Sequence, residues 1–151
     1  MVGKLKQKEP IQFFSDSVRL SLKNRAALKR FMNRLINDEG RALNSLSYIF
    51  CNDEILLEIN RKYLGRDFYT DVITFDLSND PDEILADIYI SLDRVKENSK
   101  NLKIPLAAEL HRVMFHGLLH LCGYDDKTAT QLKRMRTKED FYLNLYFTRF
   151  T

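Results

Sequence analysis

The sequence predicts an α+β fold in which helices pack on a small mixed four-stranded sheet. Two observations lead to this prediction. Strand-like runs of β-branched and aromatic residues alternate with amphipathic stretches in the first ninety residues, whereas only helical patterns follow Leu92. No repeat or linker interrupts the chain, which has only 5 Gly and 3 Pro in 151 residues. We therefore expect residues 1–151 to form a single domain.

The first part of the chain predicts strands and helices in alternation. The short run Ile11–Ser15 is half apolar, and the alternating residues Leu46, Tyr48 and Phe50 are typical of a second strand. Between them, apolar residues recur at helical spacing before Gly40: Leu28, Phe31, Met32, Leu35 and Ile36. Asp53 is expected to cap the next helix, which carries Leu56, Ile59, Asn60 and Tyr63 and leads to a loop over Gly65–Tyr69.

The next two strands are expected to form a hairpin. The runs Val72–Phe75 and Ile84–Ile90 are rich in β-branched and aromatic residues, and the segment between them contains Asn79, Asp80 and Pro81, which favour turns. Three helices are expected to follow: Leu92 to about Asn101, about Leu106 to Cys122, and about Thr128 to Phe147. Pro105 suits the start of the second of these helices.

Composition excludes several classes of protein. No apolar run approaches the roughly 20 residues that span a membrane. The N-terminal segment Met1–Pro10 is polar and lacks the apolar core of a secretory signal, so a cytoplasmic location is expected. Two cysteines, Cys51 and Cys122, cannot make a disulfide framework and are expected to stay reduced.

The candidate chemistry lies in the run His116-Gly-Leu-Leu-His120 and the residues after it. Residues four apart share one face of a helix, so His116 and His120 can offer two imidazole nitrogens to one metal ion. Gly123 can end the helix in the left-handed conformation and return the chain, which places Asp126 as a third ligand. Two histidines and one carboxylate suit a catalytic Zn²⁺, although iron or manganese also fits.

The alternative is that the two histidines are simply packed in a helix, because an isolated H-x-x-x-H pair is weak evidence for a metal. A metal site is favoured by three features: the glycine that ends the helix, the carboxylates that follow it, and Gly117 inside the helix. Glycine inside a helix costs about 1 kcal/mol relative to alanine, so it needs a reason, and close approach by a substrate or another backbone is one. Gly117 also occupies the position of the catalytic Glu in H-E-x-x-H peptidases, which argues against a peptidase. His111 is expected to be a surface or partly packed histidine, and Cys122 a small buried residue.

These residues resemble the YbeY family, the bacterial ribosomal RNA maturation factors regarded as metal-dependent endoribonucleases. The family signature H-G-x-L-H-L-x-G-Y-D-H reads HGLLHLCGYDD here, starting at His116. The segments INRKY (59–63), TDVITF (70–75) and LADIYIS (85–91) are similar to further motifs of the family. The resemblance implies an α+β domain with a zinc site, in which His116 and His120 are ligands and Asp126 replaces the third histidine.

A second departure from the family pattern is Leu64, where the family usually has an arginine that faces the site. Arg66 either reaches the same phosphate or is an ordinary exposed charge. Asp71 either positions water or satisfies a backbone turn. Asp125 is either a partner of a ligating histidine or a group that hydrogen-bonds the helix end.

The leading hypothesis is metal-assisted hydrolysis of RNA, with a ribosomal RNA precursor as substrate and the small subunit or its proteins as partners. Two alternatives are a ribosome-associated assembly factor with a mainly structural metal and a metallohydrolase of another substrate. The net charge of only +3 does not by itself indicate nucleic-acid binding. The chain nevertheless has a basic stretch at 127–138 and an acidic stretch at 76–87, so its surface is expected to be dipolar. Ordinary solvated helix faces are the alternative for each stretch.

Overall fold

The computed structural model describes residues 9–150. Most of the polar segment Met1–Pro10, for which no secretory signal was expected, lies outside the described residues. Four strands form one mixed sheet in the order β1-β2-β4-β3: β1 (Ile11–Ser15), β2 (Ala42–Cys51), β3 (Val72–Asp76) and β4 (Glu83–Ser91). The first three strands in this order run parallel, and β3 pairs antiparallel with β4. Within residues 9–150, five helices complete the fold: α1 (Arg25–Asp38), α2 (Asp53–Leu64), α3 (Leu92–Leu102), α4 (Leu106–Leu121) and α5 (Ala129–Arg149). The predicted fold class and the hairpin are confirmed.

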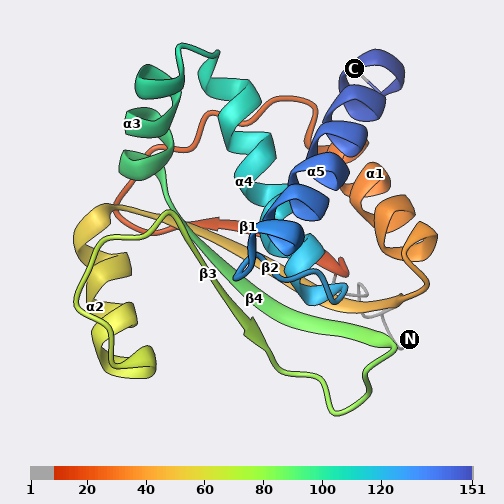
Figure 1. Ribbon diagram of the computed structural model, residues 1–151, viewed down its shortest axis with the longest axis horizontal. Coiled ribbons are helices and arrows are strands. Elements are labelled where there is room, and N and C mark those ends of the chain that lie inside the picture. Colours follow the sequence, from red (N-terminus) through yellow and green to blue (C-terminus); the bar gives the residue numbers. More distant parts are fainter. Residues whose placement is uncertain (1–8, 151) are drawn as a thin grey trace, which may run out of the picture.

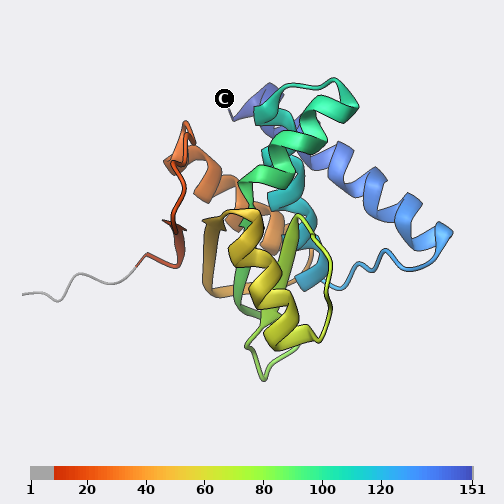
Figure 2. The same ribbon diagram turned by 90° about the vertical axis from the view of Figure 1, so that its left-hand side faces the viewer.

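The helices cover both faces of the sheet, as Figure 1 and Figure 2 show from two directions. On one face, α1, α4 and α5 share the main core with β2 and β4, and the stripe predicted on α1 is fully buried. On the other face, α2 covers a smaller apolar cluster around Leu56 and Ile73. None of the helices in residues 9–150 is both long and apolar enough to cross a membrane.

One predicted helix cap differs from the structure. Asn52, not Asp53, caps α2, because its side-chain oxygen accepts a hydrogen bond from the Ile55 N–H at 2.9 Å. Asp53 lies in the first turn, where it accepts hydrogen bonds from the Ser91 hydroxyl and the Arg94 guanidinium. Asp53 therefore ties α2 to the start of α3.

Gly117 lies close to side chains of the sheet, which gives a structural reason for a glycine inside α4. A Cβ atom at this position would lie 3.1 Å from a methyl group of Ile88 and 3.3 Å from one of Val72. The glycine thus lets α4 pack closely on β3 and β4. This packing brings the histidine face of α4 beside the residues that precede β3.

Candidate metal centre

One cleft of about 410 Å³ brings together all six residues that the sequence singles out. Its lining includes Arg66, Asp71, His116, His120, Asp125 and Asp126. These residues come from the loop after α2, the start of β3, α4 and the loop after α4. The packing of α4 on the sheet therefore assembles one site from two distant parts of the chain.

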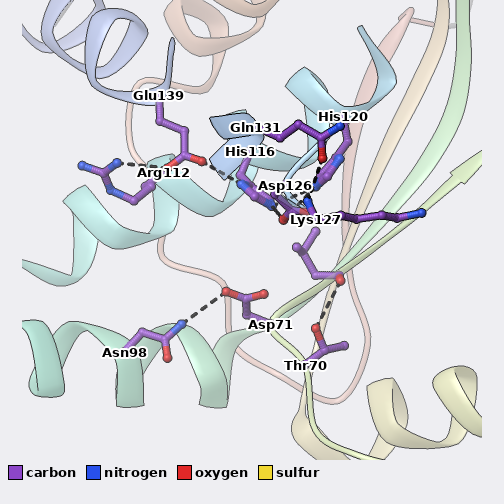
Figure 3. Close-up of polar contacts among 11 residues, drawn as sticks. Thr70, Asp71, Asn98, Arg112, His116, His120, Asp126, Lys127, Gln131 and Glu139 are labelled. Atoms are coloured by element: carbon purple, nitrogen blue, oxygen red, sulfur yellow. Dashed lines mark hydrogen bonds and ion pairs between the residues drawn. The ribbon is translucent and has the colours of Figure 1, made fainter. Parts of the chain in front are cut away.

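The end of α4 turns the chain back over its own histidines. The Gly123 N–H donates to the His120 carbonyl and the Tyr124 N–H to the Leu119 carbonyl, with Gly123 at φ 103°. These two hydrogen bonds form a Schellman motif, for which glycine is the favoured residue. The predicted left-handed turn at Gly123 is thus confirmed, and it returns Asp126 to the face of α4 that carries His116 and His120 (Figure 3).

Three ligand atoms converge at this point. The Nε2 atoms of His116 and His120 lie 3.0 Å apart, and Oδ2 of Asp126 lies 3.3 Å from each of them. A tetrahedral zinc ion with ligand distances of about 2.0–2.1 Å needs ligand atoms about 3.3 Å apart, and an octahedral ion needs about 3.0 Å. His116, His120 and Asp126 are therefore positioned to hold a divalent metal ion.

Glu139 on α5 fixes the orientation of His116. Nδ1 of His116 lies 2.7 Å from Oε2 of the buried Glu139 carboxylate, to which it donates a hydrogen bond (Figure 3). Because Nδ1 carries the proton, Nε2 is left as the atom that can bind a metal. The other oxygen of Glu139 accepts a hydrogen bond from Arg112 at 3.0 Å, and Arg112 also pairs with Asp140.

The surroundings of His116 favour its protonated form. Burial lowers the pKa of His116, but the hydrogen bond and charge of Glu139, with the charges of Asp126 and Asp71, outweigh burial and raise it overall. A metal ion at Nε2 must displace a proton there whenever the imidazole is charged. Metal binding is therefore expected to weaken as the pH falls.

Asp71 lies across the cleft from the three ligand atoms. The Asn98 amide of α3 donates a hydrogen bond to its carboxylate at 3.2 Å (Figure 3). Burial raises the pKa of Asp71, although the charge of His116, two backbone N–H groups and the Asn98 amide act in the opposite direction. The carboxyl group is thus held in place and is easier to protonate than an exposed aspartate.

The remaining predicted residues lie around the cleft. Leu64 and Arg66 both line it, so the cleft contains an arginine although position 64 is a leucine. Asp125 also lines the cleft, but the carboxylate that accepts the hydrogen bond of His116 is Glu139, and no hydrogen bond of the Asp125 side chain is found within residues 9–150. Lys127, from the predicted basic stretch, lines the cleft as well.

Glu139 is the functional residue that the sequence did not reveal. It lies in line with Met135, Tyr142 and Tyr146 on the buried stripe of α5. An acidic residue in an apolar stripe could have revealed Glu139, because a buried carboxylate needs a charged or hydrogen-bonding partner. The identity of that partner depends on how α5 packs on α4.

Two other predictions can be compared with the structure. His111 is more buried than expected: its Nδ1 donates to the Ala107 carbonyl, and its ring stacks on Tyr146 with centroids 5.3 Å apart. Cys122 is buried as predicted, and both cysteines are free.

A second cleft adjoins the first and contains a buried acid, Glu109. The two clefts share Asp71, His116 and Asp126. Glu109 is 4% exposed, and its Oε2 atom has no hydrogen-bond partner among the described residues. Burial raises the pKa of this carboxyl, although the charge of Arg112 lowers it. Ionised Glu109 therefore destabilises the fold.

Replacing Glu109 by glutamine is expected to raise the free energy of unfolding at pH 7 by about 1 kcal/mol, because a neutral amide costs less to bury than a carboxylate. An acid with a raised pKa stabilises the fold below its unfolded-state pKa of about 4.3 and loses that contribution as the pH rises. The advantage of the variant over the wild type should thus grow from pH 4 to pH 7 in urea unfolding. The exposed Glu97→Gln is the matched control, and a pH-independent difference for Glu109→Gln would contradict the account.

Comparison with known proteins identifies the family of this chain. Residues 11–146 match the family model described as Endoribonuclease YbeY. Proteins named Endoribonuclease YbeY from Cytophaga hutchinsonii and Flavobacterium psychrophilum are 45% and 44% identical, over 92% and 88% of this chain and 97% and 94% of their own lengths. The solution structure of TM1509 from Thermotoga maritima is 26% identical, with a TM-score of 0.61, and the match covers 89% of this chain and 87% of that one. The chain therefore belongs to the YbeY family.

Proposed function

We propose that this protein is a metal-dependent endoribonuclease that processes ribosomal RNA on the small subunit in the cytoplasm. The observation that carries the proposal is the convergence of His116, His120 and Asp126 in an open cleft. The names of its relatives support RNA as the substrate. Two imidazoles and one carboxylate are an accepted ligand set for catalytic zinc, so we propose Zn²⁺ as the ion.

A divalent ion in this position supplies a Lewis acid that polarises a phosphoryl oxygen and lowers the pKa of a water molecule. The chain's own groups orient the reactants. Three carboxyl groups, Asp71, Asp125 and Asp126, and two cations, Arg66 and Lys127, line the cleft. A bound divalent cation would offset the charge of these carboxylates and favour the entry of a phosphate.

Asp71 is proposed to accept the proton of the attacking water. A general base typically contributes a factor of about 10² to 10⁴ in rate, so Asp71→Asn should slow cleavage to that extent. The rate should rise with pH as Asp71 ionises, and this acid limb should be missing in Asp71→Asn. The hydrogen bond from Asn98 lowers the pKa of Asp71. Asn98→Ala removes this hydrogen bond and should therefore move the acid limb to higher pH. If Asp71 only stabilised a turn, Asp71→Asn would lower the melting temperature and leave the pH profile unchanged.

The proposal is tested with a panel of substrates. Zinc-loaded protein should cut a ribosomal RNA precursor internally and should leave a peptide and a small phosphoester intact. Activity on the phosphoester or peptide without activity on RNA would instead support a metallohydrolase of another substrate. Binding to ribosomes without any cleavage would support an assembly factor.

A further inference from the structure

The loop 65–69, on one wall of the metal cleft, is held in a fixed conformation. Asn60, a buried residue of α2, accepts a hydrogen bond from the Arg66 N–H at 3.2 Å through its carbonyl. Its side-chain amide donates to the Phe68 carbonyl at 3.0 Å. An ion pair between Arg61 and Asp67 adds a third link to α2. The side chains of the loop are therefore presented from a preorganised backbone.

Phe68 is an exposed aromatic residue in a cleft whose other lining residues are mostly polar or charged. It is one of the residues that line the metal cleft, and it is 56% exposed. Among the described residues, no aromatic or cation contact to its ring is found. Burying so exposed a ring would be favourable, so the structure leaves a flat apolar surface available to a ligand.

The neighbouring Tyr69 differs from Phe68 although it is equally exposed, at 55%. Its ring lies under the Arg94 guanidinium, 5.6 Å from the ring centroid, and it does not line the cleft. The loop thus carries two exposed aromatic residues, of which only Phe68 is among the residues that line the cleft. Tyr69 therefore serves as a comparison for Phe68: it is equally exposed and in the same loop, but it does not line the cleft.

We propose that Phe68 is a stacking platform for a nucleobase of the RNA that enters the cleft. This inference rests on the proposed function and names how the same site binds its substrate. A nucleotide offers both groups that the cleft can bind: a flat ring for Phe68 and a phosphate for Arg66 and Lys127. In residues 9–150 neither cation has an ion pair with a carboxylate. Stacking accepts every base, so the platform would fix the position of the strand with little sequence preference.

The test uses zinc-loaded protein and a single-stranded oligoribonucleotide that contains the fluorescent base 2-aminopurine, mixed by stopped flow so that binding is read before cleavage. Stacking on an aromatic side chain should quench the base in the wild type and in the matched control Tyr69→Ala. In Phe68→Ala the quench should disappear and KM should rise by about 5- to 150-fold with kcat nearly unchanged. Phe68→Trp should restore both properties.

Two results would overturn the inference: an undiminished quench and KM in Phe68→Ala, or equal losses in Tyr69→Ala. Because Phe68 is exposed, the alanine variant should keep the melting temperature of the wild type. Failure of the proposed function is recognised separately, as a wild-type protein that cuts no RNA. In that case the quench alone still decides whether Phe68 stacks on a base.

Discussion

Replacing His120 by alanine is expected to abolish both metal retention and RNA cleavage. The substitution removes one of three ligand atoms and leaves His116 and Asp126 as an incomplete set. Metal ions typically supply several kcal/mol of transition-state stabilisation, and each 1.4 kcal/mol corresponds to about tenfold in rate. Cleavage should therefore fall by about a thousandfold or more. Elemental analysis of the purified protein and an RNA cleavage assay measure the two effects.

The matched control is Asp126→His, which introduces the third histidine of the family signature. This variant keeps three ligands, so it should retain a metal ion and show a stronger preference for zinc. His120 is partly exposed on α4, so both variants should give the circular dichroism spectrum of the wild type. RNA cleavage that survives in metal-free His120→Ala protein would show that the site is not catalytic.

Replacing Glu139 by glutamine is expected to weaken metal binding about 10- to 100-fold, as is typical when the partner of a ligating histidine is changed. Glutamine has nearly the same shape but lacks the charge that raises the basicity of His116. It also pairs less strongly with Arg112, which holds Glu139 in place. Competition with a chelator of known affinity measures the loss.

Asp140→Asn separates this role from a general effect on the α4–α5 contact. Asp140 is adjacent to Glu139 and also pairs with Arg112, at 2.8 Å, but it is exposed and does not contact His116. Metal affinity in Asp140→Asn should equal that of the wild type. Equal losses of affinity in the two variants would mean that Glu139 acts only through packing.

The sequence predicted most elements of the fold because local signals determine them. The β3–β4 hairpin has turn residues between two apolar runs, and the buried stripe of α1 follows helical spacing closely. The strand order β1-β2-β4-β3 was not predicted, because parallel pairing joins segments that are far apart in the chain. The Asp53 prediction was wrong because two adjacent residues can both cap a helix, and the local backbone selected Asn52.

The same difference between local signals and contacts far apart in the chain applies to the site. His116, His120 and Asp126 lie within eleven residues of sequence, and helix geometry with a glycine turn suffices to bring them together. Glu139, which contacts His116, and Phe68, which lines the cleft, come from other parts of the chain. Their positions depend on the packing of α5 on α4 and on the hydrogen bonds from Asn60, neither of which has a periodic signature in the sequence.

The most direct test of the central claim is a metal titration of the wild-type protein. The protein is stripped with a chelator, Zn²⁺ is added back in steps, and bound metal and RNA cleavage are measured on the same samples. The account predicts that the cleavage rate rises in proportion to occupancy and levels off at one ion per chain. Full cleavage by the stripped protein, or a rate that does not follow occupancy, would contradict it.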